Sequence, residues 1–410
     1  MRRPGPGLSR PLCGAALAAV LLLSGTAPAG AGPPEGVPAA DGKGQELPGM
    51  PSVLADRTGC TPASKAKAEK QDWSRQRLDL ERVRRHGTGA GVTVALIDTG
   101  VATGAAGTDG RVTARGAAGE DCVGHGTFLA GLIAGSGRGD ARLAGVAPGA
   151  ELLALRGTDE RGRPEASLVT RAVRDATEAG AEVIAVGVAL PERNAGLTRA
   201  VADAVEAGAV VVAAAAPDPP SRAVGKEIPA RTYWPAGEPG VLSVADMLPG
   251  GARPDGALPT DSVDLVAPGA GVVSGGPRGS GHYLGSGPSV AAAYAAGTAA
   301  VVRGTRPDDS PEEVARRLRA TAYPADIPQL DAYAAVTAVL GEPGGAAVAD
   351  TGSEPVALRD TAAADRATGR AVVFVLIGTA GVLAVLWAGY AVPRARARAR
   401  GWRSADAGGK

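Results

Sequence analysis

The stretch Gly287-Pro-Ser-Val-Ala-Ala-Ala-Tyr-Ala-Ala-Gly297 places Ser289 at the start of a helix built from small residues. Upstream of it, the apolar run Val92–Ile97 ends in the turn Asp98-Thr-Gly100. A second apolar helix begins within Asp121-Cys-Val-Gly-His-Gly-Thr127. An aspartate, a histidine and a serine thus each lie where a strand ends or a helix begins. Functional side chains of parallel sheets gather at such places, so these segments bear on both fold and function.

Short β-branched runs alternate with helical segments between residues 73 and 341. The runs expected as strands are Val92–Ile97, Leu152–Arg156, Val183–Val188, Val210–Ala215, Val241–Ala245 and Val263–Val266. Apolar residues recur at helical spacing in Phe128–Ala134, Ala166–Ala179 and Leu197–Ala207. Ser310-Pro-Glu-Glu313 has the sequence of a capping box and predicts a further helix through about Thr321. The alternation predicts an α/β fold with a doubly wound, mostly parallel sheet flanked by helices.

The chemistry available to Ser289 depends on a nearby base. A serine hydroxyl needs a group that accepts its proton, and histidine suits this role because its pKa lies near neutrality. Of the three histidines, His86 lies in a charged turn and His282 in a glycine-rich loop, whereas His125 lies between two glycines at a helix start. Asp98 alone is compatible with an ordinary turn, and Ser289 alone with a helix N-cap. Together they predict a catalytic triad in which Asp98 orients His125 and His125 takes the proton of Ser289.

These three segments resemble the active-site motifs of subtilisin-like serine proteases. Four further stretches resemble landmarks of that family: Gly145-Val-Ala-Pro-Gly-Ala150, Tyr233-Trp-Pro-Ala236, Pro239-Gly-Val-Leu-Ser-Val-Ala245 and Val263-Asp-Leu-Val-Ala-Pro-Gly269. The resemblance covers residues 73–341, which we expect to form one peptidase domain. It implies a subtilisin-like fold, peptide-bond hydrolysis by the triad, and a substrate-binding edge at Val186, Gly187 and Val188.

The sequence departs from the family at the oxyanion hole, the group of donors that binds the charge developing on the substrate's carbonyl oxygen. Subtilases carry an asparagine just after the strand that here reads Val210–Ala216, and this chain has Pro217-Asp218 there. Proline donates nothing, and an aspartate carboxylate would repel a negative charge. Pro288 replaces the family's threonine before the serine but leaves the Ser289 N–H free. We therefore expect the Ser289 backbone N–H as the surviving donor, with Pro217 in the asparagine's position.

Within the subtilases, the chain resembles mycosins, the membrane-anchored proteases of actinobacterial type VII secretion systems. The supporting features are Asp121-Cys122 directly before Gly124-His-Gly-Thr127, a cysteine in the N-terminal extension, and a C-terminal anchor with a basic tail. The resemblance implies secreted proteins or peptides as substrates and a type VII secretion membrane complex as partner. The first hypothesis is an anchored endopeptidase. The alternative is a catalytically impaired scaffold with a protease fold that stabilises the secretion complex.

Both ends of the chain carry apolar segments with charged neighbours. Residues 1–31 begin with two arginines, continue through an apolar run and end in small residues, which predicts a secretory signal. Residues 371–392 are uncharged and, at about 1.5 Å per residue, long enough to cross a bilayer core of about 30 Å. Arginines crowd residues 393–410, so we expect this tail in the cytoplasm and the catalytic domain outside. Residues 32–72 then form an N-terminal extension and residues 342–370 a flexible linker.

Cysteine content and charge limit the remaining possibilities. Removal of a signal would leave two of the three cysteines, Cys60 and Cys122, in an oxidising compartment, where an isolated pair usually forms a disulfide. Two unrelated thiols are the alternative. The formal net charge of +1 gives no indication of nucleic-acid binding. No metal-ligand cluster stands out and no cofactor is expected, while calcium sites on loops stay open as a possibility.

Overall fold

The computed structural model describes residues 46–341, apart from positions 106, 109, 138–142 and 219–229, and a helix at 362–405. The chain divides into two compact units, Met1–Leu340 and Gly341–Lys410. The signal expected at 1–31 lies outside the described residues, as do most of the expected linker and the last residues of the tail.

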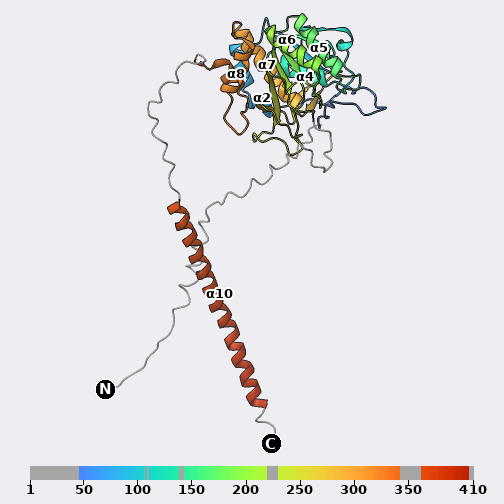
Figure 1. Ribbon diagram of the computed structural model, residues 1–410. Helices are drawn as coiled ribbons and strands as arrows, with labels where there is room; N and C mark the ends of the chain where they lie inside the picture. Colours follow the sequence, from blue (N-terminus) through green and yellow to red (C-terminus); the bar gives the residue numbers. More distant parts are fainter. Residues whose placement is uncertain are drawn as a thin grey trace, which may run out of the picture. The chain divides into compact units, whose positions relative to one another are not determined.

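The first unit is built on a seven-stranded sheet in which all neighbouring strands are parallel (Figure 1). In spatial order the strands are β2 (Val112–Ala114), β3 (Glu151–Arg156), β1 (Thr93–Asp98), β4 (Val183–Val186), β5 (Val210–Ala214), β6 (Val241–Met247) and β7 (Leu265–Pro268). The central strands are buried on both faces, which explains their continuous apolar sequences. The strand order reverses beside β1, and such a switch point is where open α/β sheets bind ligands.

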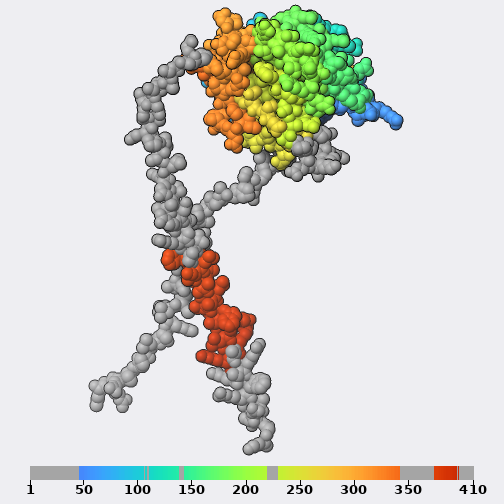
Figure 2. Space-filling view, viewed as in Figure 1, coloured from blue at the N-terminus to red at the C-terminus, as the bar shows by residue number. Residues whose placement is uncertain are grey.

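Helices cover both faces of this sheet, which confirms the predicted fold class. Along β1, Val94 and Leu96 belong to one hydrophobic cluster, whereas Ala95 and Ile97 belong to another. The first cluster includes residues of α3 (Leu80–His86), α4 (His125–Ala134), α7 (Pro288–Thr305), α8 (Pro311–Ala320) and α9 (Ala332–Thr337). The second includes residues of α5 (Ala166–Glu178) and α6 (Ala195–Glu206). Figure 2 shows the orange surface of the C-terminal helices of this unit continuous with the green and yellow surface of the sheet region.

The long helix α7 runs through the core and carries the small-residue stretch that contains Ser289. Every residue from Pro288 to Val302 is buried. Small residues let neighbouring side chains approach the helix closely: a Cβ added at Gly297 would lie 2.8 Å from the Cβ of Val146. Because closely packed protein cores are hard to deform, this burial holds the start of α7 in place against the end of the sheet.

The predicted elements match the observed ones closely, and the missed elements are short. The capping box of α8 is present, because Ser310 Oγ accepts from the Glu313 N–H and the Glu313 carboxylate accepts from the Ser310 N–H. Sequence reasoning missed elements that are too short to show a hydrophobic period: α2 (Trp73–Arg77), α3, β2, a 3-10 turn at Gly116–Gly119, α9, and the antiparallel hairpin of β8 (Val272–Gly275) and β9 (His282–Gly285).

The described part of the N-terminal extension is integrated into the first unit. The Met50 N–H donates to the Leu284 carbonyl over 2.7 Å, and the Leu54 N–H donates to the Arg161 carbonyl over 2.9 Å. The extension thereby contacts both the β9 strand and the loop after β3. Part of it forms the blue surface at the edge of the unit in Figure 2.

The second unit contains a single described element, the helix α10 (Ala362–Ala405). Its segment Phe374–Arg394 is long and apolar enough to cross a membrane, with a mean hydropathy of 2.0. The helix differs from the expected bounds at both ends: it begins inside the predicted linker and continues through much of the basic tail. Alanine and arginine favour helix on both sides of the apolar segment, which accounts for the extra turns.

Candidate active site

Asp98, His125 and Ser289 come together at the carboxyl end of β1. Asp98 ends β1, His125 begins α4, and Ser289 lies in the first turn of α7. Each helix follows a glycine with positive φ, Gly124 at 93° and Gly287 at 133°. Residues with a Cβ avoid such backbone angles, so glycine is required for the chain to turn here into each helix. Three segments far apart in the sequence therefore meet at one point.

The three side chains form a continuous hydrogen-bonded chain. His125 Nδ1 lies 2.8 Å from Asp98 Oδ1, and His125 Nε2 lies 3.1 Å from Ser289 Oγ. The Thr99 N–H donates to the same Asp98 oxygen over 2.8 Å and fixes the carboxylate. Both imidazole distances are within the reach that proton transfer requires. A carboxylate, an imidazole and a hydroxyl in this order can activate the hydroxyl as a nucleophile.

A fourth buried residue, Asp121, holds the turn that carries His125. Its carboxylate accepts hydrogen bonds from Thr99 Oγ1 (2.9 Å), Gly124 N (2.6 Å), Thr127 N (2.9 Å) and Thr127 Oγ1 (2.7 Å). Burial raises the pKa of Asp121, while the bonds from Thr127, Gly124 and Thr99 oppose that rise. The sequence motif Asp121–Thr127 did not by itself predict this role for Asp121. The signal was its spacing, since an aspartate commonly accepts from backbone N–H groups that follow it at a helix start.

Replacing Asp121 by alanine is expected to destabilise the protein and impair His125. Four buried donors would lose their acceptor, and each unsatisfied buried donor costs about 1–3 kcal/mol. We therefore expect the free energy of unfolding to fall by at least about 4 kcal/mol in chemical denaturation. Glu120→Ala is the matched control, because Glu120 is exposed and adjacent. Equal stability of the two variants would show that the Asp121 contacts do not support the turn.

A second carboxylate, that of Asp218, contacts Ser289 and His125. Asp218 Oδ1 accepts from the Ser289 N–H over 3.1 Å, and Oδ2 accepts from Ser289 Oγ over 2.8 Å. Oδ2 also lies 3.0 Å from His125 Nε2. Two expectations are corrected here. The side chain that faces Ser289 from the loop after β5 belongs to Asp218 and not to Pro217, and the Ser289 N–H is not free but engaged by Asp218.

His125 therefore lies between two carboxylates. Burial lowers the pKa of His125, but the charge of Asp98, the hydrogen bond to Asp218, the bond to Asp98 and the charge of Asp218 together raise that pKa well above its usual value. An imidazolium ring with both nitrogens protonated satisfies both carboxylates. A ring with a proton on both nitrogens cannot accept a further one, so the use of His125 as a base depends on where the proton between it and Asp218 lies.

A small pocket adjoins the triad and includes only part of the expected substrate edge. Gly187 and Val188 line it. Val186 does not, because it is fully buried and pairs with both β1 and β5, so its assignment to the edge is wrong. A Cβ on Gly187 would collide with Asp98 Oδ2, so this position requires glycine. Among the residues that the structure describes, no group of three or more His, Cys, Asp or Glu side chains could hold a metal ion.

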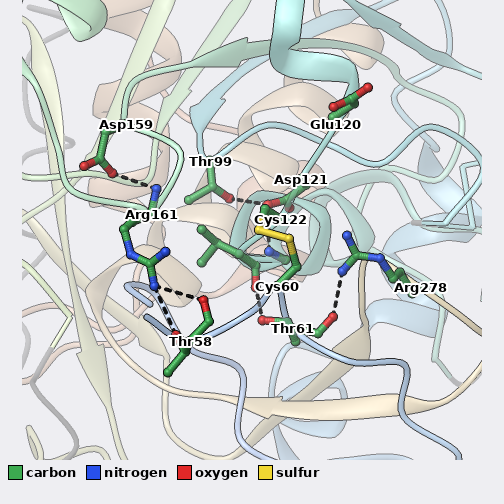
Figure 3. Close-up of a disulfide and its surroundings, with 12 residues drawn as sticks. Thr58, Cys60, Thr61, Thr99, Glu120, Asp121, Cys122, Asp159, Arg161 and Arg278 are labelled. Carbon is green, nitrogen blue, oxygen red and sulfur yellow. Dashed lines mark hydrogen bonds between the residues drawn. A yellow bond between two sulfur atoms is a disulfide. The ribbon is translucent and has the colours of Figure 1, made fainter. Parts of the chain in front are cut away.

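The N-terminal extension is tied to this site by a disulfide between Cys60 and Cys122 (Figure 3). Beside it, the Thr61 N–H donates to the Cys122 carbonyl over 3.0 Å, and Arg278 donates to the Thr61 carbonyl over 2.7 Å. Cys122 directly follows Asp121, so the bridge joins the extension to the segment that positions His125 (Figure 3). Ser52 and Val53 of the extension line the pocket beside the triad. The predicted disulfide is confirmed, and the extension contributes one wall of the site.

Comparison with known proteins identifies a family and relatives of this chain. The model of the subtilase family matches residues 89–362. Mycosin-3 of Mycobacterium tuberculosis is 31% identical over an alignment that covers 90% of this chain and 97% of the relative.

Two solved structures are similar to a large part of this chain. One is the serine protease MycP1, described as an essential component of the type VII (ESX-1) secretion system; it has a TM-score of 0.59 and 27% identity, and the match covers 71% of this chain and 96% of that one. The other is the MycP3 protease from the type VII (ESX-3) secretion system, with a TM-score of 0.60, 28% identity and coverage of 72% and 97%.

Proposed function

Because this chain belongs to the subtilase family of serine proteases, we propose that it is a membrane-anchored endopeptidase of the mycosin type that cleaves exported proteins or peptides. The observation that carries this proposal is the unbroken chain from Asp98 through His125 to Ser289, at 2.8 and 3.1 Å. Fold alone would not be sufficient, since one fold can serve many activities. The site supplies nucleophile, base and orienting group in hydrogen-bond reach of one another.

The reaction follows from these positions. Ser289 Oγ attacks the substrate carbonyl carbon while its proton passes to His125 Nε2, and Asp98 stabilises the resulting imidazolium through Nδ1. The proton on Nε2 then moves to the amine nitrogen as the peptide bond breaks and leaves an acyl-enzyme. A water molecule, activated by the same imidazole, releases the second product. The extended substrate would lie along the pocket edge at Gly187 and Val188, where strand-like recognition uses backbone hydrogen bonds.

The helix α10 and the relatives support a location at the membrane. Phe374–Arg394 has a mean hydropathy of 2.0 and carries no charge before Arg394, and further arginines follow it. Positive charge favours the cytoplasmic side, so the peptidase unit lies outside. MycP1 and MycP3 are described with type VII secretion systems, and we propose such a membrane complex as the partner of this protein.

A scaffold without catalysis is the second candidate, and one observation favours it. The Asp218 carboxylate bonds the Ser289 N–H, the place where an oxyanion would bind. A negative charge there opposes the charge that develops during attack. Under this hypothesis the fold is kept to stabilise the secretion complex.

The peptidase and scaffold functions can be distinguished in cells that carry the Ser289→Ala variant in place of the natural protein. The peptidase function predicts that specific cleavage products disappear from the secreted proteins, because the nucleophile is lost, while the variant accumulates normally. Ser286→Ala is the matched control, since Ser286 is exposed and outside the triad. Quantitative mass spectrometry of secreted peptide termini is the readout. If deletion abolishes secretion while Ser289→Ala changes neither secretion nor any cleavage product, the scaffold function is correct.

A further inference from the structure

The Asp218 carboxyl group contacts both Ser289 and His125, the residues proposed to react. Its two oxygens reach the Ser289 N–H, the Ser289 hydroxyl and His125 Nε2 at 3.1, 2.8 and 3.0 Å. Its side chain is 7% exposed. Gly287 makes this approach possible, because a Cβ on that residue would collide with Asp218 Oδ1. The carboxyl group thus occupies a place shaped to receive it.

Both positively and negatively charged groups surround the Asp218 carboxyl group. The start of α7, with its positive dipole end, stabilises negative charge. The ionisable groups nearby are His125 from α4, Asp98 from β1, and Asp246 from β6, whose partner Arg253 lies 3.4 Å away. Burial raises the pKa of Asp246, the charge of Arg253 lowers that pKa, and the charge of Asp218 raises it. Asp246 and Asp218 therefore interact electrostatically. Asp98 and Asp246 oppose a charge on Asp218, while His125 supports one.

We propose that Asp218 is the second oxyanion donor of this protease, acting as a neutral carboxylic acid that shares one proton with His125. This proposal rests on the proposed peptidase function and adds a residue to it. With one proton on the pair, two arrangements exist: a carboxylate beside an imidazolium, and a carboxylic acid beside a neutral imidazole. The first is the resting form, in which the base is blocked and the oxyanion place is filled. The second has a free base and an O–H donor where subtilases place an asparagine amide.

The reaction proceeds from the second arrangement, with a carboxylic acid at Asp218 and a neutral His125 ring. Ser289 Oγ bonds to the carbonyl carbon, its proton moves to neutral His125 Nε2, and the carbonyl π electrons move onto the substrate oxygen. That oxygen takes the Ser289 N–H and accepts a hydrogen bond from the Asp218 O–H, and Asp218 keeps its proton. His125 then protonates the leaving nitrogen as the carbon–nitrogen bond breaks. The pair again holds one proton when the acyl-enzyme has formed.

The shared proton gives the enzyme a distinctive pH dependence. A second proton on the pair fills His125 and abolishes the base, so activity falls toward acid. Loss of the shared proton restores the Asp218 carboxylate, which repels the oxyanion, so activity falls toward alkali as well. The wild type should have a bell-shaped profile whose limbs belong to the Asp218–His125 pair as a unit.

The test compares kcat/KM for a fluorogenic peptide between pH 4 and pH 10 in full-length wild type, Asp218→Asn and Asp246→Asn. The amide of Asp218→Asn donates without a proton to lose, so we expect its alkaline limb to vanish and its rate at high pH to exceed wild type by about 10²-fold or more. Asp246→Asn removes a neighbouring buried carboxylate that lies outside the reacting groups and should retain the bell shape. An unchanged profile in Asp218→Asn, or a lower rate at every pH with retained folding, would overturn the proposal.

A second readout does not need turnover. NMR titration of the His125 ring nitrogens, in a chain with only three histidines, reports the proton directly. The expected result is a His125 pKa well above its usual value in wild type and a clear fall in Asp218→Asn. An unshifted titration overturns the shared proton, whatever the activity. A shifted titration without hydrolysis by any variant at any pH overturns the donor role and the peptidase function together.

Discussion

Replacement of Ser289 by alanine is expected to lower kcat for peptide hydrolysis by about 10⁴-fold or more, measured at the pH optimum of the wild type. Among the described residues, the Ser289 hydroxyl is the one alcohol within hydrogen-bond reach of His125, and it lies 3.1 Å from His125 Nε2. His125→Ala should cost about as much as Ser289→Ala, and the double variant little more than either, because the residues act as one unit.

The control for this prediction is Ser286→Ala, which removes a hydroxyl from an exposed residue just before α7. Its Oγ accepts only the Gly271 N–H among the described contacts, so a normal kcat is expected. Residual hydrolysis by Ser289→Ala at the wild-type rate would place the nucleophile elsewhere. Additive losses in the double variant would mean that His125 and Ser289 act independently.

Replacement of Asp72 by alanine is expected to lower the free energy of unfolding by about 3–5 kcal/mol, because it leaves a buried guanidinium without its counter-charge. Arg75 is 0% exposed and lies 2.7 Å from Asp72 Oδ2. Arg75 also donates to the carbonyls of Leu143, Ala144 and Val273, so this ion pair joins α2 to the loop after α4 and to β8. Denaturant unfolding followed by circular dichroism measures the change.

An exposed ion pair provides the comparison for Asp72. Glu81 and Arg85 lie 2.8 Å apart on the surface of α3, with side chains 74% and 68% exposed. Such pairs contribute about 0–1 kcal/mol, so Glu81→Ala should change stability by no more than that. A loss from Asp72→Ala as small as that from Glu81→Ala would contradict the role assigned to the buried pair.

Asp72 also shows where sequence reasoning about domains reached its limit. It falls at the end of the expected extension, yet it caps α2 and anchors Arg75 inside the unit. The sequence in this region lacks a hydrophobic period, and the partners of Arg75 come from positions about 70 and about 200 residues away. Contacts of that range cannot be inferred from local pattern.

The sheet and the triad were predictable because their signals are local. Strands buried on both faces are continuous apolar runs, such as β5, and amphipathic α5 and α6 show their period directly. Asp98, His125 and Ser289 each lie at an element boundary that glycine or a turn announces in the sequence. The disulfide followed from compartment and number alone, and the structure adds that it supports the segment before His125.

The role of Asp218 could not be predicted in the same way. Local sequence placed Pro217 and Asp218 in the loop after β5, but which of the two turns toward Ser289 depends on how that loop meets the start of α7. Gly287 has no side chain and therefore leaves room for the Asp218 carboxylate beside Ser289. Charge repulsion alone suggested a weakened site, whereas the contact with His125 provides a proton that can remove the repulsion.

The most direct test of the account is fluorophosphonate labelling of the purified full-length protein, with the adduct located by mass spectrometry. An activated serine attacks the phosphorus, fluoride leaves as the phosphorus–fluorine bond breaks, and the serine proton passes to the adjacent base, so no substrate needs to be known. The account predicts an adduct on Ser289 in wild type and faster formation of that adduct in Asp218→Asn at alkaline pH. It predicts no adduct in Ser289→Ala, and no adduct on Ser289 in His125→Ala. Absence of the Ser289 adduct from both wild type and Asp218→Asn across the pH range would contradict the assignment of Ser289 as the nucleophile.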